Sequence, residues 1–359
     1  MNKKTATDRH PAAGKKARAK AKGHAARNAV FIILGVTIVA IAVAAMPYFL
    51  SQNAGAAIIK IPEYAKAENV KDSLAKYYGK DFATRTMRLF SSVEKNPASR
   101  HGAYEIPEGA SPFQAARILA RGAQYTVKVT INGVRQFDPF IDRIAAKFNF
   151  PAADLRALLN DPATLRPYGL TPEQAPSLFF NDTYYLYWTA TPADVVKKVG
   201  ENYLKFWNDD RRRKAAELGL TPAEVMTVAS IVDEETNQIS EKGRIGRLYI
   251  NRLKKGMRLQ ADPTVKFALG DFSIRRITSQ HLSAPGPYNT YRVKGLPPGP
   301  IRTTSTATVQ AILDSSPSDD IYMCAKEDFS GFHNFASDYD THLRNARRYQ
   351  EALDRRGIE

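Results

Sequence analysis

The sequence has one cysteine, Cys324, among its 359 residues. An intrachain disulfide is therefore excluded, and a lone thiol without a Cys-His signature is expected to be a small buried apolar residue. His281, His333 and His342 are not spaced as a metal-binding motif. The sequence also lacks phosphate-binding loops, dinucleotide-binding fingerprints and the Gly-x-Ser-x-Gly nucleophile motif. It thus predicts neither a metal nor a cofactor.

Basic residues are concentrated at the N-terminus of a chain whose formal net charge is +16. Residues 1–28 hold nine lysines and arginines against one aspartate, a net +8 that is half of the total. A segment rich in Lys, Ala and Gly without apolar periodicity is typical of disorder. Residues 1–28 are therefore predicted to be a disordered basic tail. Its position beside an apolar run favours a role in membrane topology over nucleic-acid binding.

Residues 29–50 form this apolar run, 22 residues without a charge. As a helix it would be about 33 Å long, which is enough to cross a bilayer. Basic residues favour the cytoplasmic side, so the tail is expected in the cytoplasm and residues 51–359 on the extracytoplasmic (periplasmic) side of the inner membrane. A cleaved signal peptide is the alternative, although its apolar core would be unusually long.

The exported part is predicted to be an α+β protein. Residues 51–59 are interpreted as a linker, residues 60–124 as a small α/β unit, and residues 125–359 as a larger mixed α+β domain. In the small unit we expect a helix near 71–93, a strand near 102–109 and a helix that begins at the N-cap Ser111.

In the larger domain, alternating apolar residues from 125 to 131 predict a strand, and Asn132-Gly133 predicts a hairpin turn after it. Residues 256–304 are dense in turn residues and are expected to be strand-like. A segment of this kind inside a compact domain is usually functional.

Three consecutive acidic residues end a predicted helix that begins at Thr221. Val228, Ile231 and Val232 lie seven, four and three positions before Glu235, so Glu235 is expected on the apolar face. Asp233 and Glu234 are expected to have easier access to water.

A carboxyl group on an apolar face has a raised pKa unless it is paired, and a raised pKa suits a general acid. The alternative is structural: Glu235 would pair with a core arginine such as Arg252 or Arg258, or would cap a neighbouring loop. Helical spacing leaves both interpretations open.

Four blocks in order carry a resemblance to a known family: "VASIVDEET", "INRLKKGMRLQADPTV", "PYNTYRVKGLPPGPI" and "FHNFAS". They resemble the MltG/YceG-like endolytic murein transglycosylases. The resemblance implies a membrane anchor, a LysM-like subdomain at about 60–124 and a catalytic domain. It also implies a lyase that cuts the glycan strand of peptidoglycan between N-acetylmuramic acid and N-acetylglucosamine and leaves 1,6-anhydromuramyl ends. The family's catalytic acid corresponds to Glu235.

Loop residues with polar or aromatic side chains are the candidates for sugar binding. They are Gln260, Asp262, Thr264, Tyr288, Asn289, Thr290, His333, Asn334 and Phe335. Asp182 and Tyr184 are added because they match the Asp and Tyr of a block that is commonly Phe-Pro-Asp-Thr-Tyr in the family. This block departs from the family pattern here, since Asn181 takes the place of its proline and an upstream acid is missing. The usual His-Asn pair near the C-terminus is His342-Leu343.

The expected partners are peptidoglycan strands, the membrane and cell-wall synthases of the penicillin-binding class, with no nucleic acid. Two alternatives stay open. One is a hydrolytic muramidase that uses Asp262 as a second carboxylate, and the other is a non-catalytic peptidoglycan-binding scaffold of the division machinery.

Overall fold

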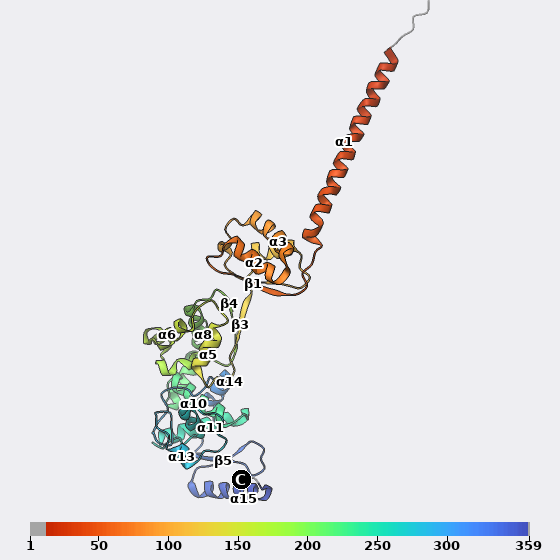
Figure 1. The fold of residues 1–359 in the computed structure, drawn as a ribbon. Coiled ribbons are helices and arrows are strands. Elements are labelled where there is room, and N and C mark those ends of the chain that lie inside the picture. The colour runs from red at the N-terminus through yellow and green to blue at the C-terminus, as the bar shows by residue number, and fades with distance from the viewer. Residues whose placement is uncertain (1–11, 358–359) are drawn as a thin grey trace, which may run out of the picture. The chain divides into compact units, whose positions relative to one another are not determined.

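The structure is a computed structural model that describes residues 12–357. The chain divides into two compact units, residues 1–125 and residues 126–359. Helices and short antiparallel strand pairs occur in both units (Figure 1). The predicted mixed α+β class is therefore confirmed.

A single long helix, α1 (Ala12–Phe49), opens the first unit. Its apolar part, Ala26–Phe49, is long and apolar enough to cross a membrane. The helix also includes residues 12–28, which the sequence predicted to be disordered; that prediction is wrong for this part of the tail. Residues 1–11 lie outside the described residues.

The remainder of the first unit packs three helices against one strand pair. The elements are β1 (Ala57–Ile61), α2 (Ala67–Tyr78), α3 (Lys80–Val93), a 3-10 helix (Pro97–Arg100), β2 (Gly102–Ile106) and α4 (Pro112–Arg121). β1 and β2 are antiparallel, with Ile59 opposite Tyr104, and both side chains are buried. The single helix expected near 71–93 is two helices, because Gly79 adopts φ 83° between them. The predicted N-cap at Ser111 is confirmed.

The second unit is mainly helical. Its helices are α5 (Phe137–Ala145), α6 (Ala152–Asn160), α7 (Pro162–Leu165), α8 (Pro192–Phe206), α9 (Asp209–Leu218), α10 (Pro222–Glu235), α11 (Ile239–Lys254), α12 (Asp262–Leu269), α13 (Ser279–Leu282), α14 (Thr306–Leu313) and α15 (Tyr339–Arg356). Its 3-10 helices are Arg166–Tyr168 and Pro172–Leu178. Its strands are β3 (Thr126–Thr130), β4 (Thr183–Tyr187), β5 (Tyr322–Ala325) and β6 (His333–Ala336).

Two sequence-based expectations about this unit are wrong. The strand β3 pairs with β4, more than 50 residues further along, so Asn132-Gly133 does not close a local hairpin. The segment 256–304 holds the helices α12 and α13, and none of its described residues is in a strand. Polar residues that favour turns also occur at the beginning of helices. The sequence pattern of this segment alone therefore did not distinguish turns from helix starts.

The helices α10 and α11 lie side by side at the centre of the second unit (Figure 1). α10 packs also on α14 and α12. Val228, Ile231 and Val232 of α10 have no solvent exposure, as the apolar-face prediction requires. α10 is therefore the most buried helix of the unit. This packing holds its last turn, where the candidate site lies, in place.

Candidate active site

The helix α10 has a defined beginning and a defined end. Thr221 and Glu224 form the predicted capping box: the Thr221 hydroxyl accepts from the Glu224 N–H, and the Glu224 carboxylate accepts from the Thr221 N–H. Glu235 is the last helical residue, and Thr236 is extended with φ −147°. The chain then turns at once into α11. This geometry places the Glu235 side chain at the edge of the helical core.

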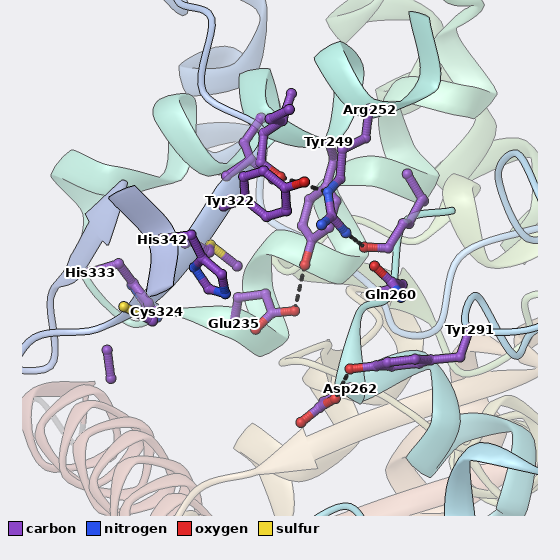
Figure 2. Close-up of a pocket in the computed structure, with 15 residues that line it drawn as sticks. Glu235, Tyr249, Arg252, Gln260, Asp262, Tyr291, Tyr322, Cys324, His333 and His342 are labelled. Atoms are coloured by element: carbon purple, nitrogen blue, oxygen red, sulfur yellow. Dashed lines mark hydrogen bonds between the residues drawn. The ribbon is translucent and has the colours of Figure 1, made fainter. Parts of the chain in front are cut away.

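Glu235 faces a pocket of about 380 Å³. That volume lies in the range of small-molecule sites. The pocket is lined by side chains from α11, the segment 259–262, the loop at Tyr291, the hairpin β5–β6 and α15 (Figure 2). Most of its lining surface is polar.

Asp233 and Glu234, next to Glu235, are held by cations. Asp233 pairs with Lys242 and accepts from the hydroxyls of Thr304 and Thr308. Glu234 accepts two hydrogen bonds from Arg135, at 2.7 and 2.8 Å, and one from Arg302 at 2.7 Å.

The expectation that Asp233 and Glu234 have easier access to water is therefore wrong. Only 5% of the Asp233 side chain and 12% of the Glu234 side chain are exposed. Lys242 comes from the next helix, α11, and Arg135 and Arg302 come from distant parts of the sequence.

Glu235 has a different environment. Among the described residues no lysine, arginine or histidine forms an ion pair with it, and its Oε1 accepts a hydrogen bond of 2.6 Å from the hydroxyl of Tyr249 (Figure 2). Burial raises the pKa of Glu235 to about 7, and the negative charges of Asp262 and Glu234 add to the rise. The Tyr249 hydrogen bond acts in the opposite direction. At neutral pH a large fraction of Glu235 is therefore protonated.

One form of the structural alternative for Glu235 is an arginine partner. The Arg252 guanidinium instead donates to three backbone carbonyls, those of Ile321, Arg258 and Leu259. It thereby fixes the start of β5 and the segment before α12 on α11. Arg252 lines the pocket but does not pair with Glu235, and neither does Arg258.

Asp262 and Tyr291 form another part of the pocket wall (Figure 2). The Tyr291 hydroxyl donates to Asp262 Oδ1 at 2.6 Å. Asp262 is exposed and is the first residue of α12. Gln260, which precedes it, has φ 51°, an uncommon left-handed conformation that directs this segment along the pocket. The predicted site residues Gln260 and Asp262 therefore do reach the pocket.

The hairpin β5–β6 and α15 supply the remaining wall. The His342 ring stacks on Tyr322 with centroids 5.1 Å apart, and burial lowers the pKa of His342, which favours the neutral imidazole. His333, a predicted site residue, also lines the pocket; its Nδ1 lies 3.0 Å from Glu241 Oε2. Cys324 is half-buried in this wall rather than fully buried as expected.

Three predicted sugar-binding residues have no access to a ligand. Thr264, Asn289 and Thr290 are 0% exposed. The hydroxyls of Thr264 and Thr290 lie 2.8 Å apart, and the Asn289 amide donates to the carbonyls of Leu282 and Ala284. These side chains fix the loop that carries Tyr291, so their predicted role in sugar contact is wrong for this structure.

Five more predicted residues lie outside the pocket lining. Tyr288 packs on Phe267, with ring centroids 4.7 Å apart. The Asn334 amide donates to Glu327, and the Phe335 ring lies under the Arg244 guanidinium. Asp182 and Tyr184 line a separate hollow beside α8, and Tyr184 is only 2% exposed.

The pocket also contains residues that the sequence did not predict as site residues: Tyr249, Tyr291 and Tyr322, together with Arg252, considered only as an ion-pair partner, and His342, noted only as a departure from the family. A signal existed for Tyr249. It lies on the buried stripe of α11 with Ile245 and Leu248, where a hydroxyl needs a partner. The others are on elements whose contact with α10 depends on the tertiary fold.

Metal chemistry has no support in the described part of the chain, where no group of three or more His, Cys, Asp or Glu side chains is arranged to hold an ion. What the geometry offers is acid–base chemistry. The site is a polar pocket with one carboxyl group that titrates near neutrality.

Fold and site thus define a mixed α+β protein with a polar pocket in which burial raises the pKa of one of the two lining carboxyl groups, that of Glu235. Residues 59–348 match the model of the YceG-like family, so the chain belongs to that family. It is 28% identical over 294 residues to the endolytic murein transglycosylase of Bacillus subtilis, covering 78% of each chain. An endolytic murein transglycosylase of Streptococcus pneumoniae is 22% identical over 301 residues, which are 79% of this chain and about half (52%) of that relative.

A solved structure supports the same fold. The crystal structure of a YceG-like protein from Listeria monocytogenes aligns with a TM-score of 0.52 at 23% identity. The alignment covers 81% of this chain and 98% of that one.

Proposed function

We propose that this protein is an endolytic murein transglycosylase that cleaves the bond between N-acetylmuramic acid and N-acetylglucosamine inside peptidoglycan strands. The observation that carries the proposal is the environment of Glu235: it lines a polar pocket, forms no ion pair with any described residue, and burial raises its pKa to about 7. The names of the family's curated relatives point to the same substrate.

Glu235 acts twice in the proposed reaction. As a carboxylic acid it donates its proton to the glycosidic oxygen, and the bond from that oxygen to C1 of the muramyl residue breaks with oxocarbenium character. As a carboxylate it then removes the proton of the 6-hydroxyl of the same muramyl residue. The 6-oxygen bonds to C1 and closes the 1,6-anhydro ring, and Glu235 regains its proton.

One carboxyl group suffices because the attacking oxygen belongs to the substrate. A hydrolase needs a second carboxylate to activate water or to form a covalent intermediate. An intramolecular hydroxyl has a high effective molarity, which replaces that partner.

Asp262 lines the same pocket and is the specific reason to test a hydrolytic muramidase as a second candidate. Its oxygen already accepts the Tyr291 hydrogen bond. We favour an electrostatic role for Asp262, in which its negative charge keeps Glu235 protonated.

The proposed setting is the extracytoplasmic side of the inner membrane. The apolar segment Ala26–Phe49 is the proposed anchor, and the nine basic residues of the tail favour a cytoplasmic N-terminus. The strand pair and helices of the first unit are proposed as a LysM-like glycan-binding subdomain. Penicillin-binding synthases are the proposed partners, because they make the strands that this reaction would cut.

The test is digestion of uncross-linked glycan strands by the full-length chain in detergent, with mass spectrometry of the products. We expect new 1,6-anhydromuramyl ends from the native protein and none from Glu235→Gln, whose side chain has nearly the same size but carries no transferable proton. Reducing muramic acid ends would instead identify a hydrolase. Strand binding without any new ends would identify a scaffold.

A further inference from the structure

Tyr249 lies between the helical core and the pocket. It is on α11 and is only 2% exposed, so its ring is fixed by packing between helices. Its hydroxyl reaches the pocket and donates to Glu235 Oε1 at 2.6 Å. Figure 2 shows the phenol directed at the carboxyl group.

A buried phenol is well suited to hold a carboxyl group that must change its protonation state. Burial and the neighbouring Glu235 raise the pKa of Tyr249 well above its usual value, so its hydroxyl remains a donor over the working pH range. A protonated carboxyl group has one O–H donor and one free acceptor oxygen. A donor fixed at one oxygen therefore favours the proton on the other oxygen.

We propose that Tyr249 is the positioning residue of the catalytic acid: its hydroxyl holds Oε1 of Glu235, so that Oε2 carries the proton delivered to the glycosidic oxygen. After the transfer the same hydrogen bond stabilises the carboxylate, because hydrogen bonds to charged groups are stronger than those to neutral ones. The inference rests on the proposed function of Glu235 and names the group that orients it.

Other charged and titratable groups also face Glu235, and they determine what removal of the phenol will do. They are Glu234 on α10, Arg252 on α11, Asp262 and Lys266 on α12, Tyr291 on the loop after α13, Tyr322 and Cys324 on β5, His333 on β6 and His342 on α15. Asp262 and Glu234 raise the Glu235 pKa, and Lys266 lowers it less than Tyr249 does. Without the phenol, the Glu235 pKa should therefore move upward.

The test compares Tyr249→Phe with a matched control, Tyr203→Phe. Tyr203 on α8 is 0% exposed, and its hydroxyl has no hydrogen-bond partner among the described residues. Both variants remove one buried hydroxyl, and only one of these hydroxyls contacts Glu235. We expect Tyr249→Phe to lower kcat by about tenfold or more and to move the alkaline limb of kcat/KM upward by about one pH unit. Tyr203→Phe should change neither.

A titration without substrate separates this inference from the proposed function. The pKa of Glu235 is followed by carbon NMR of a 13C-glutamate-labelled full-length chain in detergent, and the signal is assigned with Glu235→Gln. A higher Glu235 pKa in Tyr249→Phe supports the positioning role even if no anhydro product is ever found. An unchanged Glu235 pKa in a folded Tyr249→Phe chain overturns it, whatever happens to the rate.

A second substitution covers the case in which Tyr249→Phe does not fold. Replacement of Tyr249 by 3-fluorotyrosine keeps the hydroxyl and makes it a more acidic and hence stronger donor. We expect the Glu235 pKa to fall, opposite in sign to the effect of Tyr249→Phe. A Glu235 pKa that does not respond to the stronger donor overturns the inference.

Discussion

The last turn of α10 borders two regions that differ in their electrostatics. In one, Lys242, Arg135 and Arg302 come from three separate segments and neutralise Asp233 and Glu234. In the other, Glu235 meets a phenol and the negative charge of Asp262. Carboxyl groups of adjacent residues are thus paired with cations in the first region, while in the second burial raises the pKa of Glu235 to about 7. The neighbours of each group decide its role.

The largest contrast between the two regions should be in catalysis. Glu235→Gln is expected to lower kcat by about 10³-fold, since the group is both acid and base in the reaction. Glu234→Gln, the matched change one residue earlier, should stay within a factor of about three because the amide oxygen still accepts from Arg135 and Arg302. Rates of anhydromuramyl formation measure both. An equal loss of activity in the two variants would show that the two regions do not differ in their catalytic role.

In the cation-bound region the largest effect should be on stability. Lys242→Met leaves the buried Asp233 without its cation, which is expected to lower the free energy of unfolding by about 3 kcal/mol. Lys254→Met, on an exposed position of the same helix, is the control and should change little. Urea denaturation compares the two variants. A Lys242→Met chain as stable as the control would show that Asp233 does not depend on the pair.

Stability should also depend on pH through Glu235. Its folded-state pKa of about 7 lies above the reference value of 4.5, so the folded chain binds this proton more tightly than the unfolded chain. The free energy of unfolding should then fall as pH rises from about 4.5 to about 7, by up to about 3 kcal/mol in all. Glu235→Gln lacks this contribution and should become the more stable protein at pH 8. Parallel curves for the two proteins across this window would contradict the raised pKa.

The smallest expected effect concerns Asp262. Asp262→Asn removes a negative charge that raises the Glu235 pKa, so the alkaline limb of activity should move to lower pH by roughly half a unit. Anhydromuramyl ends should remain the product. A loss of activity of about 10²-fold or more would instead make Asp262 a catalytic carboxylate and favour the muramidase.

Local patterns in the sequence correctly predicted those features of α10 that depend on residue spacing within one helix. The capping box of Thr221 and Glu224 and the burial of Val228, Ile231 and Val232 follow from spacing, and they placed Glu235 on the inner face. The resemblance to the family pointed to the same residue.

Long-range contacts explain the wrong predictions. Lys242 and Arg302 lie on other elements and form ion pairs with Asp233 and Glu234. Helical spacing within α10 carries no information about these partners, so it predicted that the two carboxylates face water. Thr264 and Thr290 have the polarity of sugar-binding residues, but they satisfy each other inside the protein. Polarity alone does not distinguish a ligand contact from an internal hydrogen bond.

The most direct test is the pKa of Glu235 itself in the native full-length chain, obtained from the 13C carboxyl signal that disappears in Glu235→Gln. We expect this carboxyl group to titrate near pH 7, well above the reference value of 4.5 for a glutamate. A Glu235 signal that titrates near pH 4.5 would mean an ionised side chain at neutral pH, and the proposed acid would then lack its proton.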